Sequence, residues 1–431
     1  MRALQKILVI GSVWPEPASS AAGARMLELL ELFRAQSWEV IFASAASLSS
    51  HRVNLADLEV QEKLIELNAE SFDDFVRAYD PDMVLFDRFY TEEQFGWRVE
   101  KNCPHALRVL DTVDLHCLRD GREQMLKKNR AVDQEQASRL ELVKHASMET
   151  LFLAIADDDV AQREIAAIYR CDLSLIASEF EVALLRTGFS VPAALLHHCP
   201  LMRVRACTER PPFEARRHFI SIGNFRHAPN WDAVLCLKQR IWPAIRQALP
   251  QAVLHVVGSY PPPKATALHA PAQGFFVQGW AENAHQAMAQ ARVCLAPLRF
   301  GAGVKGKLAD AMVCGTPSVT TSIGAEGMHA DLAWGGAIAD DTAAFVSAAV
   351  DLFQNKSRWQ QAQERADLIV KECWQAEKMH QALMAALVLA RQQQQERRAH
   401  NFIGAMLRHH HHRSNQYFSQ WIALKNASVR Q

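Results

Sequence analysis

Apolar and polar residues alternate along the chain in blocks. Short apolar runs of the kind that form buried parallel strands occur at 7–13, 40–43, 83–86, 107–110 and 173–177. Longer stretches with apolar residues at helical spacing separate these runs, as at 24–35 and 133–167. This strand–helix alternation predicts a doubly wound α/β domain over residues 1–203.

The alternation restarts after a stretch that lacks it. Residues 204–217 are rich in arginine and contain Pro211 and Pro212, which is typical of an interdomain linker with solvated arginines. Further strands are then predicted at 219–222, 253–257, 275–278, 293–296, 318–320 and 337–338. We therefore expect a second α/β domain over residues 218–385, facing the first across a cleft.

The last part of the chain, residues 386–431, has a helical pattern and includes the histidines His409–His412. Four consecutive side chains of a helix point in four directions, so a solvated helix is expected here rather than a metal site. We predict that this segment is a helical extension that packs back onto the first half.

One predicted helix start has a specific signature. Ser178 follows the apolar run at 173–177, and Glu181 stands three residues later. This spacing predicts a capping box, in which the serine side chain caps the helix and the glutamate bonds back to the cap amide.

Composition narrows the class of protein. The chain has 431 residues, of which 49% are hydrophobic and 22% charged, and its formal net charge is zero. These values are typical of a globular protein, and the chain has no bulk field that favours nucleic acid. Its nine cysteines lack zinc-ligand spacing, and we expect reduced core cysteines at Cys236, Cys294 and Cys314. Neither a signal peptide nor a membrane span is predicted, so we expect a cytoplasmic protein. Peripheral contact with the inner face of a membrane stays open.

The segment 298–312, LRFGAGVKGKLADAM, combines three glycines with two lysines directly after a predicted strand. A helix is expected to begin near Lys305, so its first amides and its positive dipole end would face the preceding loop. Free amides, a helix N-terminus and two cations suit a diphosphate, and the residues concerned are Gly301, Gly303, Lys305, Gly306 and Lys307. The alternative is an ordinary glycine turn with two solvated lysines.

Two further groups of polar residues are candidates for binding the same ligand. Asp310 lies one turn after Lys307, where its carboxylate could accept hydrogen bonds from ribose hydroxyls or pair with that lysine. Polar residues also gather at the carboxyl end of the strand at 219–222, namely Gly223, Asn224, Arg226 and His227. They suit either donor phosphates or the ordinary work of turning the chain and capping a helix.

Candidates in the first half also follow predicted strands. Gly23 lies between the first strand and its helix, where it permits close approach of a sugar or phosphate. Asp111, Asp114 and His116 follow the strand at 107–110 and should face the cleft.

Several of these stretches resemble retaining glycosyltransferases of family 4, which have the GT-B fold of two Rossmann-like domains. The second half carries GNFRHAPN, LAPLRFGAGVKGKLADAM and GTPSVTTSIGAEGM, and the first half, more weakly, SSAAGAR, LDTVDLHCLR and ASEFEVALL. The resemblance implies that Gly303, Val304 and Lys305 hold the donor's diphosphate and sugar, and that Asp310 contacts its ribose. It also implies phosphate contacts for Gly223 and Asn224, a place near the transferred sugar for His116, and a donor contact for Gly23.

The sequence departs from the family pattern at three positions. Ala302 stands where the family has the first of two glutamates, and the second is shortened to Asp310. Asn224 takes the place of an arginine, whose charge Arg226 or Lys305 could supply. Glu326 in GAEGM is a candidate for a displaced sugar or base contact.

The resemblance implies transfer of a sugar from a nucleoside diphosphate donor to an acceptor hydroxyl, with retention at the anomeric carbon. We expect catalytic roles for His116 and Lys305 and no metal or other cofactor. The acceptor is a glycan, a lipid-linked molecule or a protein. Two other classes stay open. One is a sugar-nucleotide epimerase or phosphorylase on the same scaffold, and the other is a non-catalytic carbohydrate-assembly protein, which Ala302 favours.

Overall fold

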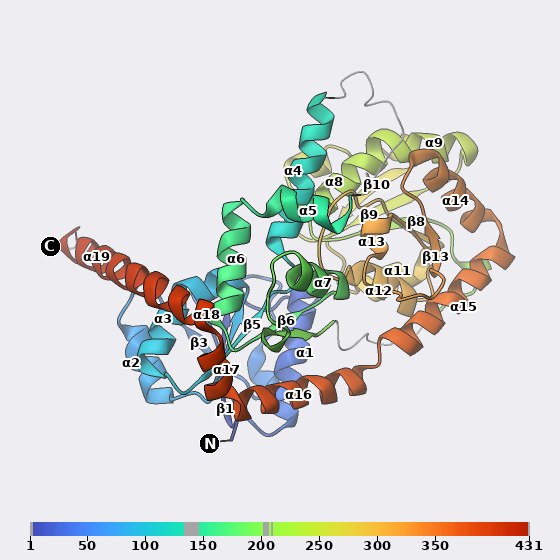
Figure 1. Ribbon diagram of the computed structural model, residues 1–431. Coiled ribbons are helices and arrows are strands. Elements are labelled where there is room, and N and C mark those ends of the chain that lie inside the picture. Colours follow the sequence, from blue (N-terminus) through green and yellow to red (C-terminus); the bar gives the residue numbers. More distant parts are fainter. Residues whose placement is uncertain (1–2, 133–145, 201–206, 208–209, 430–431) are drawn as a thin grey trace.

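The computed structural model describes residues 3–132, 146–200, 207 and 210–429, and it contains two parallel sheets flanked by helices (Figure 1). The first sheet has the order β3-β2-β1-β4-β5-β6-β7, and every neighbouring pair is parallel. Its strands are β1 (Lys6–Gly11), β2 (Glu39–Ser44), β3 (Gln61–Leu64), β4 (Met83–Asp87), β5 (Leu107–Asp111), β6 (Leu173–Ile176) and β7 (Leu196–His198).

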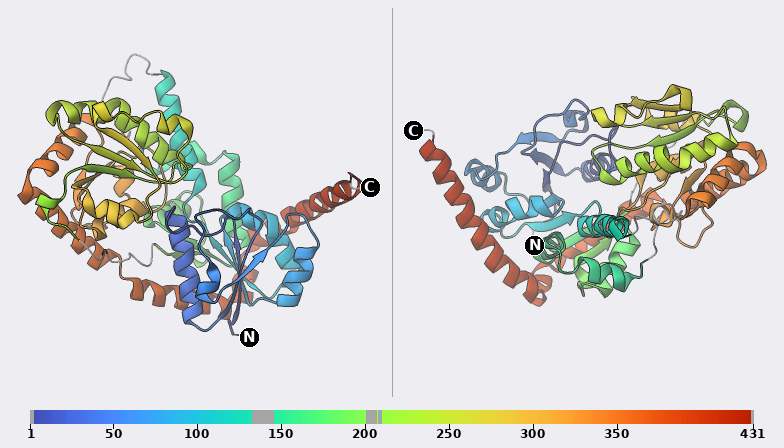
Figure 2. Two further views of the ribbon diagram at one scale, coloured as in Figure 1. Left: turned by 180° about the vertical axis from the view of Figure 1, so that it is seen from behind. Right: turned by 90° about the horizontal axis from the view of Figure 1, so that it is seen from above.

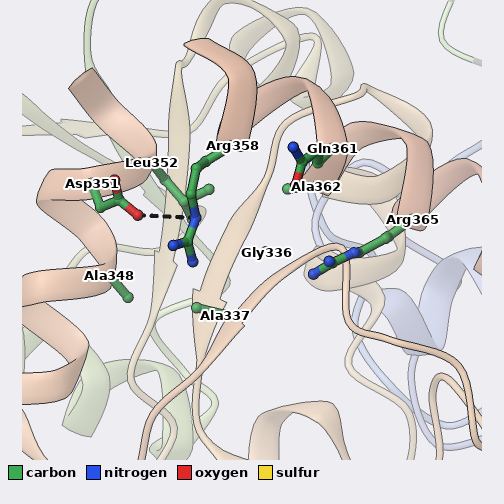
Figure 3. Close-up of a pocket in the computed structure, with 9 residues that line it drawn as sticks. All are labelled: Gly336, Ala337, Ala348, Asp351, Leu352, Arg358, Gln361, Ala362 and Arg365. Carbon is green, nitrogen blue, oxygen red and sulfur yellow. Dashed lines mark ion pairs between the residues drawn. The ribbon is translucent and has the colours of Figure 1, made fainter. Parts of the chain in front are cut away.

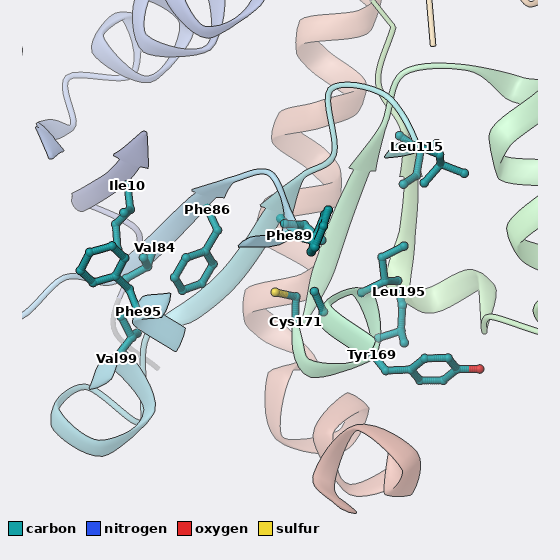
Figure 4. Close-up of a cluster of buried hydrophobic side chains, with 14 of the residues drawn as sticks. Ile10, Val84, Phe86, Phe89, Phe95, Val99, Leu115, Tyr169, Cys171 and Leu195 are labelled. Carbon is teal, nitrogen blue, oxygen red and sulfur yellow. The ribbon is translucent and has the colours of Figure 1, made fainter. Parts of the chain in front are cut away.

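Hydrophobic cores lie on both faces of this sheet, because alternate residues of a strand point to opposite sides. On β1, Leu8 and Ile10 join one buried cluster, whereas Ile7 and Val9 join another. Figure 4 shows part of the first cluster, where Phe86 and Phe95 pack beside Ile10. The helices of this domain are α1 (Ala21–Ala35), α2 (Ser71–Tyr79), α3 (Phe89–Asn102), α4 (His116–Val132), α5 (Met148–Ile155), α6 (Asp159–Arg170) and α7 (Glu179–Thr187), with short 3-10 turns at Leu55–Leu58 and Ala193–Leu195.

The second sheet has the order β10-β9-β8-β11-β12-β13 and is also parallel. Its strands are β8 (Phe219–Ile222), β9 (Leu254–Val257), β10 (Phe275–Gly279), β11 (Val293–Ala296), β12 (Ser318–Thr320) and β13 (Gly336–Ile338). Phe219 and Ile220 of β8 point into different clusters, so both faces of this sheet are covered as well. The two sheets form separate halves in each view of Figure 2.

The helices of the second domain connect these strands. They are α8 (Ala228–Cys236), a π-helical turn (Leu237–Ile241), α9 (Trp242–Ala248), α10 (Pro263–Thr266), α11 (Ala284–Gln290), α12 (Gly306–Val313), α13 (Ser322–Ala325), α14 (Thr342–Gln354) and α15 (Lys356–Cys373), with 3-10 turns at Phe213–Ala215 and Pro271–Gln273. The cysteines Cys236, Cys294 and Cys314 are free thiols buried in this domain, as predicted.

The chain then returns to the first domain. The returning helices are α16 (Ala376–Gln392), α17 (Gln394–His400), α18 (Phe402–Leu407), a π-helical turn (Arg408–His412) and α19 (Arg413–Val429). Leu383, Leu387 and Ala390 of α16 lie in the first-domain cluster that contains Ile7, and α18 and α19 contact α6 and α3. The predicted return of a helical extension is therefore confirmed. The boundary expected at residue 385 falls inside α16.

Two sequence-based expectations change. The helical region predicted at 133–167 contains two separate helices, α5 and α6, and residues 133–145 lie outside the described part. Arg216 is buried rather than solvated, because it donates to the carbonyl oxygens of Pro211, Ala291 and Cys314. The linker residues 204–206 and 208–209 lie outside the described residues. No helix among the described residues is long and apolar enough to cross a membrane.

Candidate functional site

The second-domain candidates gather where the strand order of the second sheet reverses. β8 and β11 are neighbours, and the chain leaves them for opposite sides of the sheet, which is where doubly wound sheets bind ligands. The loop after β8 carries Gly223, Asn224, Arg226 and His227, and the loop after β11 runs from Pro297 to Lys305. The structure thus brings two polar loops, each predicted at the carboxyl end of a strand, to one switch point.

Hydrogen bonds join these two loops. Lys307 Nζ donates to Asn230 Oδ1 at 2.6 Å, and Asn230 Nδ2 donates to the Asn224 carbonyl oxygen at 2.9 Å. A Cβ added to Gly223 would lie 2.6 Å from Asn230 Nδ2 and 2.8 Å from Lys307 Nζ. Glycine at position 223 therefore lets the loop after β8 approach the ammonium group of Lys307.

The glycine-rich loop ends at the start of α12, as predicted. Lys305 is the residue before the helix, and the amides of Gly306 and Lys307 in its first turn donate to no described residue. These amides and the helix dipole favour an anion at this end of α12. We call residues 301–307 the donor loop.

The two lysines of the donor loop are buried cations. Burial lowers the pKa of both Lys305 and Lys307 to about 8. Lys305 Nζ donates to the Gly303 carbonyl oxygen at 2.8 Å, and neither lysine forms an ion pair with a described carboxylate. A desolvated ammonium group that forms no direct ion pair is stabilised by an anion that enters the loop.

The first-domain candidates follow β5. His116 is the first residue of α4, and its Nε2 lies 3.5 Å from Asp114 Oδ1. Burial lowers the pKa of His116 to about 4, so the imidazole is neutral at physiological pH. Burial alone would raise the pKa of Asp114, but Arg119 and His116 outweigh it and hold that pKa at about 2. Asp114 also lies against the second domain, since a Cβ added to Gly303 would be 2.9 Å from Asp114 Cβ.

Two residues at the ends of first-domain strands have left-handed backbone conformations. Arg88, after β4, has a φ of +72°, and the β-branched Val113, after β5, has a φ of +63°. Such conformations cost about 1–3 kcal/mol each and cluster at functional sites. The turn at Val113 precedes Asp114, and the turn at Arg88 places its guanidinium against Ser12 and Asp87. Both turns lie at the carboxyl edge of the first sheet.

Glu181 does not form the predicted capping box. Ser178 precedes α7 but makes no side-chain capping bond, and Glu181 Oε1 instead accepts from the amides of Leu115 at 2.8 Å and Gly303 at 2.9 Å. The second of these bonds crosses from one domain to the other. Burial raises the pKa of this fully buried carboxyl to about 8. The capping-box prediction was wrong because the Glu181 carboxylate accepts hydrogen bonds from amides of another segment and of the other domain instead of the amide of Ser178.

Arg122 of α4 provides a second bridge between the domains. Its guanidinium binds the Glu326 carboxylate in two-pronged fashion, at 3.0 and 2.7 Å, and also donates to the Gly301 carbonyl oxygen at 2.8 Å. A third bridge joins the Tyr260 hydroxyl to Glu16 Oε1 at 2.8 Å. Glu326, a predicted sugar or base contact, is thus engaged with the first domain. Sequence reasoning missed Arg122, because a single arginine in a polar helix carries no motif.

The remaining candidates have partners of their own. Asp310 Oδ1 lies 2.9 Å from His285 Nε2, so its partner is this histidine rather than Lys307. Arg226 is exposed and stacks over the Tyr260 ring at 3.6 Å. The space beside Gly23 is filled by the main chain of Glu16, 2.5 Å from an added Cβ. Val304 packs against the cluster of Leu308 and Met312.

Ala302, where the family pattern has a glutamate, packs against the buried cluster of the first domain. A carboxylate at this position would therefore have to enter an apolar contact between the domains. The structure gives a packing reason for the departure from the pattern.

A pocket of about 310 Å³ lies away from this site. It is lined by β13, α14 and α15, and Arg358 is held by an ion pair with Asp351 at 3.1 Å (Figure 3). None of the predicted donor residues lines it. No group of three or more metal-binding side chains occurs among the described residues.

Part of the second domain is similar to a known protein family. Residues 216–355 match the sequence model of the family described as glycosyl transferases group 1, which is about a third of the chain and lies in the domain of the donor loop. A search of the curated proteins found no match.

Solved structures resemble nearly the whole chain. Sucrose-phosphate synthase from Thermosynechococcus elongatus is 16% identical over 89% of this chain and 98% of that chain, with a TM-score of 0.60. A glycosyltransferase from Rickettsia africae is 11% identical over 89% and 98%, with a TM-score of 0.60. Anabaena HepE, solved with UDP and glucose, is 12% identical over 89% and 99%, with a TM-score of 0.60. These identities show the fold alone, and the fold is the two-domain GT-B arrangement that the sequence predicted.

Proposed function

We propose that this protein is a glycosyltransferase that moves a sugar from a nucleoside diphosphate donor to an acceptor hydroxyl. The carrying observation is the placement of two desolvated lysines, Lys305 and Lys307, at the start of α12. The match of residues 216–355 to group 1 glycosyltransferases supports the same assignment of the donor loop.

The donor loop suits the leaving group of this reaction. When the bond between sugar and diphosphate breaks, negative charge develops on the diphosphate. The ammonium groups of Lys305 and Lys307 and the amides of the first turn of α12 would stabilise this charge more strongly than that of the intact donor, which accelerates the reaction. Because these groups are already desolvated, their effect is larger than it would be in water.

The acceptor would enter from the first-domain side. His116 is neutral and lies beside Asp114 at the carboxyl edge of the first sheet, where we propose that it contacts the transferred sugar. We further propose retention at the anomeric carbon, in line with the family resemblance. A UDP-sugar is the first donor to test, since Anabaena HepE was solved with UDP-glucose.

Replacing either lysine tests the donor site. In Lys307→Met and Lys305→Met we expect nucleoside diphosphate affinity to fall about 10- to 100-fold, because a hydrogen bond to a charged group contributes about 1.5–3 kcal/mol. Lys238→Met is the matched control, since its amine binds Gln273 Oε1 in the same domain away from the donor loop. Calorimetric titration with UDP, GDP and ADP gives the affinities. Unchanged affinity in both donor-loop variants would contradict the assignment.

Product analysis separates the other functions. Incubation of the tightest-binding sugar nucleotide without acceptor should leave the sugar unchanged, whereas an epimerised sugar would indicate an epimerase. Transfer to an acceptor in a hydroxyl-bearing panel supports the proposal. Nucleotide binding without any turnover would indicate a non-catalytic carbohydrate-assembly protein.

A further inference from the structure

The C-terminal helices present an apolar face that no other part of the described chain covers. Of the seventeen most exposed large hydrophobic side chains, seven lie in α18 and α19. They are Phe402, Ile403, Met406, Tyr417, Phe418, Trp421 and Leu424. Figures 1 and 2 show α19 extending beyond the rest of the first domain to the C-terminal end.

The apolar face of α19 points away from its own domain. On the opposite face, Asn415 Nδ2 donates to the Glu93 carbonyl oxygen at 2.9 Å, and Ser419 Oγ accepts from Arg98 Nη2 at 3.0 Å. Tyr417, Trp421 and Leu424 follow at spacings of four and three residues, so they form one stripe on the solvent side. Their exposed fractions are 67%, 55% and 72%. Packing on the first domain therefore does not account for this stripe.

The charges around the apolar stripe of α19 indicate what kind of surface it binds. Residues 397–431 contain six lysines and arginines and no aspartate or glutamate, although the whole chain has no net charge. Exposed Arg413 lies four residues before Tyr417, and Lys425 Nζ lies 5.3 Å from the centre of the Trp421 ring. Trp421 also stacks with Phe418 at 5.9 Å. Aromatic rings bordered by cations, without acids, are the chemistry of a helix that lies in the headgroup region of a bilayer.

We propose that α19 docks this protein on an anionic lipid bilayer, with Tyr417, Phe418, Trp421 and Leu424 inserted between headgroups. Arg413 and Lys425 bind the lipid phosphates at the two ends of the stripe. Because α19 packs on α3 of the first domain, docking holds the acceptor side of the molecule near the membrane surface.

Co-sedimentation with vesicles tests this proposal on the full-length chain. The probe is phosphatidylcholine mixed with phosphatidylglycerol, compared with phosphatidylcholine alone. The wild-type chain should bind the mixed vesicles at least about tenfold more tightly and lose this preference at high salt. Phe418→Ser/Trp421→Ser/Leu424→Ser should lose the binding without a change in thermal unfolding, since these side chains face solvent. Leu64→Ser/Leu153→Ser, which alters two leucines exposed elsewhere, is the matched control.

Each outcome decides the proposal. Arg413→Gln/Lys425→Gln should weaken binding to mixed vesicles only. Equal binding to neutral vesicles would overturn the role of the cations, and no binding to either would overturn the proposal. If sedimentation equilibrium shows a dimer that the triple variant dissociates, while vesicles do not bind, the stripe is covered by a second copy of the chain.

Discussion

At the scale of single residues, Gly303 of the donor loop contacts two residues of the first domain, Glu181 and Asp114. Its φ is +62°, and its amide binds Glu181. An added Cβ would lie 2.9 Å from Asp114 Cβ. Both the conformation and the contact therefore require glycine at this position.

We expect Gly303→Ala to weaken donor binding and to destabilise the closed arrangement of the two domains. The left-handed backbone alone costs about 1 kcal/mol in an alanine, and the collision with Asp114 adds to it. Gly279→Ala is the control, since Gly279 has a φ of +76° but its added Cβ would meet nothing nearer than 3.8 Å. Thermal unfolding and UDP titration of both variants measure the two effects. Equal losses of affinity in the two variants would contradict a specific role for the contact with Asp114.

The sequence predicted residues best where chemistry and spacing agree. Lys305 and Lys307 were identified from their place after a strand and before a helix, and the structure puts them at the start of α12. Glu181 was misassigned, because the same spacing describes a capping box and a carboxylate that reaches another domain. Only the packing of the two domains distinguishes these cases.

At the scale of elements, the strands with an apolar run could be predicted, including both edges of the second sheet, whereas the two edge strands of the first sheet could not. The predicted bounds of β8, β11 and β12 agree with the structure at every residue. β3 (Gln61–Leu64) is polar and largely exposed, and β7 (Leu196–His198) is only half-buried. Neither strand has the apolar run that identifies its neighbours, so both were missed.

The run His409–His412 forms a π-helical turn between α18 and α19, and it is not uniformly solvated as predicted. His412 is buried, hydrogen-bonded to Glu100, and has its Nε2 3.7 Å from Glu92 Oε1. Burial would lower the pKa of His412, but the hydrogen bond to Glu100 and the nearby Glu92 carboxylate outweigh it and raise that pKa. The turn thus anchors α19 to α3 through a charged imidazole.

The contact of His412 with α3 makes the packing of α19 on the first domain depend on pH. Since the folded pKa of His412 lies above its usual value near 6.5, the stabilisation is complete below pH 6.5 and is lost as pH rises through the folded pKa. We expect hydrogen exchange in residues 413–425, corrected for its intrinsic rate, to increase over this range. His412→Gln should exchange faster at low pH and show a flatter profile, while His410→Gln, at an exposed position, should behave like the wild type. A wild-type profile that stays flat would contradict the anchor.

At the scale of the whole molecule, the two domains meet in a closed arrangement held by few side chains. Arg122 donates two hydrogen bonds to Glu326, and the Gly303 amide donates one to Glu181. These bonds lie in the donor loop or next to it. Opening of the cleft therefore requires that these bonds break.

We expect Arg122→Ala to shift the molecule towards an open arrangement. Removing one partner of a largely buried ion pair costs about 3–5 kcal/mol when the other charge stays buried, and opening relieves this cost by exposing Glu326. Small-angle scattering should show a larger radius of gyration. Arg163→Ala is the control, because it removes a similar two-pronged pair with Glu93 inside the first domain. An unchanged radius in Arg122→Ala would show that other contacts hold the domains together.

The two-domain organisation was predictable because each domain repeats the strand–helix alternation within its own stretch of sequence. The bridges between domains were not, since Arg122 and Glu326 are 204 positions apart and carry no shared pattern. The return of α16 was predicted as an extension, but the sequence did not show that the contact begins before the expected boundary, at Met379 and Leu383.

The return of the chain also fixes an order of events during synthesis. Leu383, Leu387 and Ala390 cover the face of the first sheet that contains Ile7 and Val9, yet they follow the whole second domain in the sequence. The second domain, whose elements are contiguous in sequence, is complete before them. The first domain, although translated first, therefore keeps one apolar surface uncovered until the second domain and α16 have been translated. A nascent chain that stalls near residue 375 would hold a finished second domain and an unfinished first one, which makes it a natural substrate for chaperones.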